Sequence, residues 1–233
     1  MAETQHPDIT PLRHSPLEAW ATKLQDAAVP GPRGVALREI PFLTMVGLRA
    51  TPGTTTARIL SDVVGLELPA GPGPVTGTPE GVAILWQGPD EFLLVGPDET
   101  ELPAGLSAGT SDGEREPGAL PTLSTSPLAQ RLADALVADG GPGQVVDLSA
   151  NRTTLELSGP SARAVLEKGC PIDLHPRVFA VGSAVSTTLG LVQVLLWRTG
   201  EQTWRIMPRA SFAQYTAQWL LDAMTEFASL EVA

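Results

Sequence analysis

The sequence is poor in the residues that build disulfides, metal sites and cationic surfaces. It has one cysteine, Cys170, and three histidines, which excludes an internal disulfide and leaves no His or Cys cluster for zinc. Lysine occurs only at Lys23 and Lys168, and 15 basic residues face 26 acidic ones, for a net charge of -11. This balance excludes function classes that depend on attraction to nucleic acid or to an anionic membrane.

A long apolar run is also missing. The N-terminus has no apolar segment of the length that a signal peptide needs, and no later segment is long enough to span a bilayer. Together with the single cysteine, this predicts a cytoplasmic protein without a membrane partner. The 42% of hydrophobic residues among 233 are enough for the core of one domain or of two small domains packed together.

Two segments rich in proline or glycine divide the chain. Residues 1–16 contain three prolines and few apolar side chains, which predicts an extended N-terminal arm. Residues 96–125 combine acidic residues with glycine and proline, which predicts an acidic linker. We therefore expect a first α+β half at 17–95 and a second at 126–233.

In the first half, residues 42–49 are apolar enough for a buried strand, and residues 54–64 have helical spacing behind a Thr54 cap. Residues 82–88 and 92–96 are short apolar runs joined by a turn, which predicts a hairpin.

In the second half, Ser126 and Pro127 begin an amphipathic helix, and a strand at 153–159 precedes a short helix that starts at Pro160. Three further strands are expected at 184–190, 191–197 and 203–207. A last helix near 209–227 is expected to bury four large side chains, Phe212, Tyr215, Trp219 and Met224.

The two halves resemble each other. Residues 59–69 match 165–175, and each half has a hairpin that carries a tryptophan. The prediction is an α+β fold of duplicated ferredoxin-like strand-helix-hairpin units, although similarity between such short segments can also arise from shared patterning. Four tryptophans, Trp86, Trp197, Trp204 and Trp219, are expected in the core. The strand at 191–197 is apolar on more than one face, which favours cover by another subunit.

The chain offers few candidates for chemistry. Cys170 follows a short helix, whose C-terminal end disfavours a thiolate, so a buried, inert cysteine is expected. His175 lies between leucine and proline and is expected to be an exposed loop residue. The glycine-rich segments match neither the dinucleotide fingerprint nor the P-loop. We therefore predict no catalytic, cofactor-binding or metal-binding residue.

A polar cluster stands just before the strand at 153–159. Asp147, Asn151 and Arg152 either orient a small ligand such as a pterin or form a turn in which Arg152 pairs with a neighbouring acid. Arg209 follows Pro208 at the start of the last helix and can bridge to a partner or to a carboxylate. Asn151, Arg152 and Arg209 are therefore predicted as subunit or ligand contacts.

Three segments, at 88–97, 151–179 and 208–223, resemble the gamma subunit family of heterotetrameric sarcosine oxidase. The likeness covers roughly residues 35–227 and is strongest from Ser149 onward. Its most specific features are Gly159-Pro160, Cys170-Pro171, Asp173-Leu174 and the segment 209–212 in that order.

The resemblance implies a fold similar to the folate-binding domain of the glycine-cleavage aminomethyltransferases. It implies an accessory chain without a cofactor, packed chiefly on the alpha subunit of a complex that also holds beta and delta subunits. The other subunits of such a complex use FAD, FMN, NAD and tetrahydrofolate. The complex oxidises sarcosine to glycine, forms hydrogen peroxide, and passes the one-carbon unit to tetrahydrofolate or releases it as formaldehyde.

Two other interpretations stay open from the sequence. One is a free-standing folate-binding or aminomethyltransferase-like protein, and the other is a binding module outside one-carbon metabolism. Lys168-Gly169-Cys170 also resembles the start of a motif in folate-binding proteins of iron-sulfur cluster assembly. In that family an aromatic residue and Gly-Gln-acid follow the cysteine, whereas Pro-Ile-Asp-Leu-His follows here, so no functional thiol is transferred.

Overall fold

The computed structural model describes residues 13–98 and 126–228, and the strand pairs in this part are antiparallel. The arm at 1–16 and the linker at 96–125 lie mostly outside these residues. The helices are α1 (Ala21–Asp26), α2 (Thr55–Val64), α4 (Pro127–Asp139), α5 (Ala162–Glu167) and α6 (Ala213–Ala228), with 3-10 turns at Glu18–Trp20 and Ala210–Phe212. The expected α+β class is confirmed.

A six-stranded sheet has the order β1-β8-β11-β10-β9-β3. Its strands are β1 (Ala36–Ile40), β8 (Thr154–Ser158), β11 (Thr203–Pro208), β10 (Val192–Gly200), β9 (Ser183–Leu189) and β3 (Gly73–Pro74). A five-stranded sheet has the order β4-β5-β6-β2-β7. Its strands are β4 (Thr76–Gly77), β5 (Ala83–Gly88), β6 (Glu91–Gly96), β2 (Thr44–Arg49) and β7 (Gln144–Asp147).

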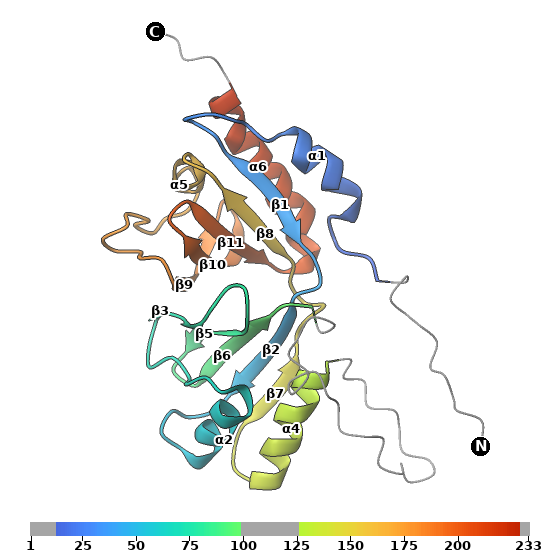
Figure 1. Ribbon diagram of the computed structural model, residues 1–233, viewed down its shortest axis with the longest axis vertical. Helices are drawn as coiled ribbons and strands as arrows, with labels where there is room; N and C mark the ends of the chain where they lie inside the picture. The colour runs from blue at the N-terminus through green and yellow to red at the C-terminus, as the bar shows by residue number, and fades with distance from the viewer. Residues whose placement is uncertain (1–12, 99–125, 229–233) are drawn as a thin grey trace, which may run out of the picture.

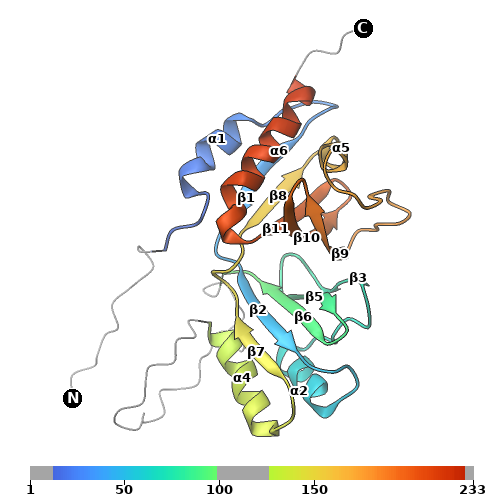
Figure 2. The same cartoon turned by 180° about the vertical axis from the view of Figure 1, so that it is seen from behind.

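The molecule has four layers, with the two sheets inside and helices outside (Figure 1). One apolar core joins the six-stranded sheet to α1, α5 and α6, and a second joins the five-stranded sheet to α2 and α4. A third core lies between the sheets and includes Leu43, Leu195, Trp197 and Met207. Figure 2 shows α1 beside α6 at one end of the molecule and α2 beside α4 at the other.

The two halves of the chain exchange strands. Strand β1, from the first half, forms the outer strand of the six-stranded sheet by pairing with β8. Strand β7, from the second half, pairs with β2 in the five-stranded sheet. Neither strand was expected from the sequence. The hairpins β5-β6 and β10-β11 nevertheless hold equivalent places, beside β2 and β8, while a duplication of ferredoxin-like units stays a prediction.

Local signals fixed most of the remaining elements. The Thr54 side chain accepts a hydrogen bond from the Ala57 backbone and caps α2, and Ser126 does the same for Ala129 at the start of α4. Both helices end at a glycine in the left-handed conformation, Gly65 and Gly140. The expected hairpin at 82–96 is also confirmed as β5 and β6.

The last helix packs differently from expectation. Met224 is buried, but Phe212 and Tyr215 are 47% and 43% exposed, so their predicted burial is wrong. The face of α6 that meets the sheet carries mainly small residues and leucines, namely Ala213, Thr216, Ala217, Leu220, Leu221, Ala223 and Met224. Small side chains allow the helix to approach the sheet closely, which leaves the bulkier aromatic rings at the rim. Of the four tryptophans, Trp197 and Trp204 are 1% exposed and Trp86 and Trp219 are partly buried against the cores.

Candidate functional site

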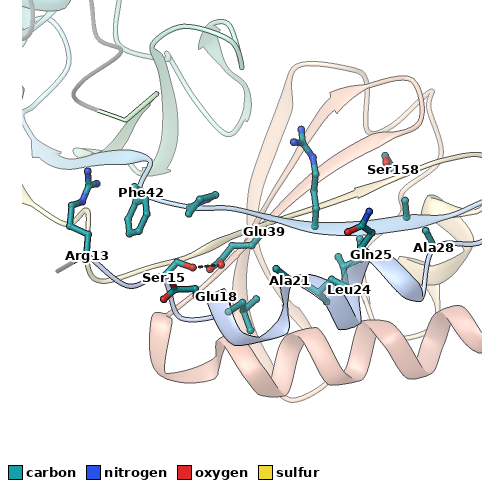
Figure 3. A pocket seen from close by; sticks show the side chains of 15 residues that line it. Arg13, Ser15, Glu18, Ala21, Leu24, Gln25, Ala28, Glu39, Phe42 and Ser158 are labelled. Carbon is teal, nitrogen blue, oxygen red and sulfur yellow. Dashed lines mark hydrogen bonds between the residues drawn. The ribbon is translucent and has the colours of Figure 1, made fainter. Parts of the chain in front are cut away.

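A groove of about 570 Å³ runs between α1 and the outer strand β1. Figure 3 shows side chains from both elements turned toward the space between them. The groove is lined by Arg13, Ser15, Leu17, Glu18, Ala21, Leu24, Gln25, Ala28, Ala36, Leu37, Arg38, Glu39, Pro41, Phe42 and Ser158. Strand β1 pairs with β8 on one side, and no strand in the described part of the chain pairs with its other side. The groove therefore follows an open sheet edge.

The charged side chains of this groove are already engaged within the chain. The Arg38 guanidinium donates to a Glu156 carboxylate oxygen at 2.8 Å, and Arg13 lies 2.9 Å from an Asp98 carboxylate oxygen. The Glu39 carboxylate accepts hydrogen bonds from Ser15 Oγ at 2.5 Å and, on its other oxygen, from Thr153 Oγ1 at 2.6 Å. An occupant of the groove would therefore meet apolar surface and charged groups that already have partners within the chain.

Phe42 is the strained residue of this region. It lies in the short connection that takes the chain from β1 in one sheet to β2 in the other, and its φ is 60°. A bulky residue rarely adopts this left-handed conformation. The Arg13 guanidinium lies 4.2 Å from the centre of the Phe42 ring, so a cation–π contact stabilises the position of the ring.

Two substitutions separate the strain at Phe42 from the contacts of its ring. Alanine removes the ring and keeps the unfavourable φ, whereas glycine removes the ring and adopts this φ freely. We expect Phe42→Gly to be more stable than Phe42→Ala by about 1 kcal/mol, the usual cost of left-handed backbone in a residue with a Cβ. Urea unfolding of the full chain measures the difference. If Phe42→Ala were the more stable of the two, the φ of Phe42 would carry no strain.

A second hollow, of about 290 Å³, adjoins the groove, and Arg13, Ser15 and Phe42 line both. The other residues around it are His14, Pro16, Ile40, Leu43, Met45, Ser149, Ala150, Arg152, Thr153 and Thr154. The hydroxyl groups around this hollow differ in whether they form hydrogen bonds. Ser149 Oγ accepts a hydrogen bond from the Met45 backbone and Thr153 Oγ1 donates to Glu39. Thr154 Oγ1, in contrast, is buried and has no hydrogen-bond partner in the part of the chain that the structure describes. A buried hydroxyl left unpaired is costly and points to a missing partner.

The three residues predicted as contacts lie close to one another, and one of them lines this hollow. Arg152 and Arg209 face each other in an isolated antiparallel bridge, and the Asn151 carbonyl oxygen accepts a hydrogen bond from the Ala210 backbone at 2.9 Å. Of the three, Arg152 lines the hollow, and Asn151 and Arg209 are exposed beside it. Burial, and next the charge of Arg209, lower the pKa of Arg152.

The structure shows one part of the turn interpretation of this cluster and corrects another. Asp147 Oδ1 accepts a hydrogen bond from the Ser149 backbone at 2.9 Å, so the expected turn is present. The expected pairing of Arg152 with a neighbouring acid is wrong within the described residues. Its guanidinium instead donates to the Met207 carbonyl oxygen at 2.9 Å. The pairing of β11 with β8 explains this, because it supplies a carbonyl from a distant part of the chain.

The other candidates lie away from both hollows. Cys170 is buried as expected, with its Sγ 3.9 Å from Thr187 Oγ1, and His175 is exposed as expected. Among residues 13–98 and 126–228, no group of three His, Cys, Asp or Glu side chains is placed to hold a metal ion. No helix in that part of the chain is long and apolar enough to cross a membrane.

Few features of the sequence predicted the groove or the burial of Thr154. The strand β1 contains Arg38 and Glu39 among three apolar residues, a mixture that does not alternate clearly. Thr154 is one of several polar residues before the strand, and its burial depends on the approach of β11 and β1 from either side of β8. The mixed Leu-Arg-Glu-Ile pattern after a glycine was the one signal that pointed to an edge strand.

Comparison with known proteins gives a consistent set of relatives. A model of the sarcosine oxidase, gamma subunit family matches residues 119–226. The chain is 47% identical over 233 residues to the sarcosine oxidase subunit gamma of Corynebacterium sp. strain U-96, and 46% identical to that of Arthrobacter sp., and each match covers the full length of both chains.

Solved structures agree with these relatives. A heterotetrameric sarcosine oxidase from Corynebacterium sp. U-96 contains a chain that matches with a TM-score of 0.80 and 47% identity, covering 95% of this chain and 100% of that one. The aminomethyltransferase T of the glycine cleavage system from Bartonella henselae matches with a TM-score of 0.55 and 17% identity, covering 90% of this chain and 57% of that one. The second match shows a shared fold and confirms that part of the expectation.

Proposed function

The chain belongs to the sarcosine oxidase gamma-subunit family and is the gamma subunit of a heterotetrameric sarcosine oxidase, and we propose that its part in the complex is accessory and non-catalytic. The observation that carries this proposal is the identity of 47% over the full length of a gamma subunit. At this identity and coverage the fold and the place in an assembly are both expected to be retained. The proposal adds that assembly, and not chemistry, is the task of the chain.

The proposed division of labour leaves the cofactors to other subunits. FAD, FMN, NAD and tetrahydrofolate would be held outside this chain, where the complex oxidises sarcosine to glycine and forms hydrogen peroxide. The one-carbon unit would pass to tetrahydrofolate or leave as formaldehyde. The state of the charged groups supports this division, since Arg13, Arg38 and Glu39 of the groove are engaged in ion pairs and hydrogen bonds within the chain.

The proposed partners are the alpha, beta and delta subunits, with alpha as the main neighbour. The proposed location of the complex is the cytoplasm. The open edge of β1 beside an apolar groove supports such a role, because an unpaired strand edge is costly to leave exposed and is suited to cover by another chain. The exposed Asn151 and Arg209, with Arg152 between the sheets, are proposed as contacts to a partner or a ligand.

Purification of the tagged full chain from its native host tests the proposal. We expect a yellow complex with three further subunits that consumes oxygen when sarcosine is added. Coexpression of the other three subunits without this chain should yield protein that keeps its flavin absorption but assembles poorly. Loss of the flavin absorption together with this chain would contradict the accessory role, because it would place a cofactor contact here.

The alternative function is a free-standing folate-binding protein, and the fold shared with aminomethyltransferase T favours keeping it as a second candidate. This alternative predicts a colourless chain that purifies without partners and binds tetrahydrofolate in a fluorescence titration. The two proposals therefore differ in subunit masses and absorption spectrum before any activity is measured.

A further inference from the structure

Two arginines stand together without an acid at the junction of the two sheets. Directly opposed residues in an antiparallel bridge place their side chains on the same side, so Arg152 and Arg209 project together. No acidic side chain within residues 13–98 and 126–228 forms an ion pair with either of them. This is unusual in a chain with a net charge of -11. Two neighbouring cations, one of them partly buried, destabilise each other until an anion joins them.

A second, independent observation comes from Thr154. Its side chain is 0% exposed, its Oγ1 has no hydrogen-bond partner within the described residues, and it lies in the wall of the same hollow as Arg152. A hydroxyl can donate one hydrogen bond, and no acceptor for it lies within the described residues. The guanidinium and the hydroxyl thus both offer donors at one place.

We propose that the hollow beside Arg152 and Arg209 binds a carboxylate. A planar guanidinium matches the two oxygens of a carboxylate, and Arg209, which is paired with Arg152 in the bridge, adds a second positive charge. The apolar walls made by Ile40, Phe42, Leu43 and Met45 suit a carboxylate on a short aliphatic chain. The volume of about 290 Å³ is at the small end for ligand sites, which also favours a short group.

Such a carboxylate has two sources, a glutamate or aspartate side chain of another subunit and a small free carboxylic acid. The first source deepens the proposed function and rests on it, because it makes this hollow a contact within the oxidase. The second makes the hollow a ligand site of the gamma subunit itself. The chemistry of the three donors is the same in both cases.

Three variants of the full chain test the proposal. Arg209→Gln removes the exposed charge and leaves the core intact. Thr154→Val keeps the shape of the buried side chain, removes an unpaired hydroxyl, and is expected to fold at least as stably as the natural chain. The double variant Arg58→Gln and Arg177→Gln is the control for net charge, because both arginines are exposed and lie away from the hollow. Arg58 is on α2, and Arg177 is on the loop before β9.

The first measurement is how much gamma subunit stays bound to the coexpressed complex as the sodium chloride concentration rises. The second is thermal unfolding of the full chain, compared between acetate and chloride at equal ionic strength. If the carboxylate belongs to a partner, Arg209→Gln and Thr154→Val weaken the affinity of the gamma subunit for the complex by about tenfold or more. This is a typical effect of losing a charge-assisted hydrogen bond. Acetate also competes with retention. For a free carboxylic acid, retention is unchanged, and both variants lose the stabilisation that acetate gives the natural chain.

The control double variant should behave like the natural chain in both measurements. If Arg209→Gln and Thr154→Val match the natural chain in retention and in acetate, the carboxylate site is overturned. An equal loss in the control would also overturn it, since net charge alone would then explain the effect. Failure of the natural chain to join any complex is a different outcome, which contradicts the proposed function and leaves the acetate measurement to decide on the site.

Discussion

Replacing Trp197 with alanine is expected to lower the free energy of unfolding of the full chain by about 3–5 kcal/mol, the range for removing a buried aromatic side chain. Trp197 is 1% exposed on β10 and lies in the core between the two sheets. The cavity would open between two layers that are each held by their own helices. Neither sheet can collapse into it without moving against the other.

Trp197→Phe provides the matched control. The indole Nε1 has no hydrogen-bond partner among residues 13–98 and 126–228. Phenylalanine therefore loses only volume and the stronger contact of the indole with Arg205, whose guanidinium lies 5.3 Å from the centre of the ring. Its cost should be less than half that of alanine. Guanidinium chloride unfolding monitored by circular dichroism measures both. An alanine variant within about 1 kcal/mol of the natural chain would mean that the core between the sheets adds little to stability.

Gly159→Ala is expected to lower the free energy of unfolding by about 2–5 kcal/mol when backbone strain and overpacking are added. Gly159 has a φ of 117°, and a Cβ there would lie 2.5 Å from the Gly34 carbonyl oxygen. That oxygen accepts a hydrogen bond from the Ser161 backbone at 3.1 Å. The substitution would therefore push apart the start of β1 and the end of β8, and widen the groove.

Gly53→Ala isolates the effect of φ from that of contact. Gly53 has a φ of 83°, but a Cβ there would meet nothing within 4 Å. Its cost should be about 1 kcal/mol, the strain of the left-handed region alone. The difference between the two variants in thermal or urea unfolding then measures the close approach of Gly34. Equal costs would show that the backbone near Gly34 yields without resistance.

Much of the local structure followed from patterns of a few residues. Thr54 and Ser126 cap the helices that they were expected to begin, because a cap depends on hydrogen bonds within one turn. The hairpin at 82–96 followed from two apolar runs and a short turn for the same reason. The family resemblance rested on short motifs that follow one another in order through the second half. The family model and the identity with known gamma subunits confirmed it.

The expectation for α6 was wrong where it depended on packing. Phe212 and Tyr215 have helical spacing with Trp219, and that spacing shows which side chains share a face. It does not show which face turns toward the sheet when two faces carry apolar residues. The smaller side chains took the buried face because they allow the closer contact.

The amino-acid sequence alone sufficed for the helix caps, the hairpins, the α+β class and the family, since each depends on neighbouring residues or on motifs read in order. The exchange of β1 and β7 between sheets, the groove beside β1, and the meeting of Arg152 with Arg209 next to the β8-β11 pair emerged only from the folded chain. These pairings join segments far apart along the chain. Their free energy depends on which surfaces remain to be covered once the local elements have formed, and no short stretch of sequence contains that information.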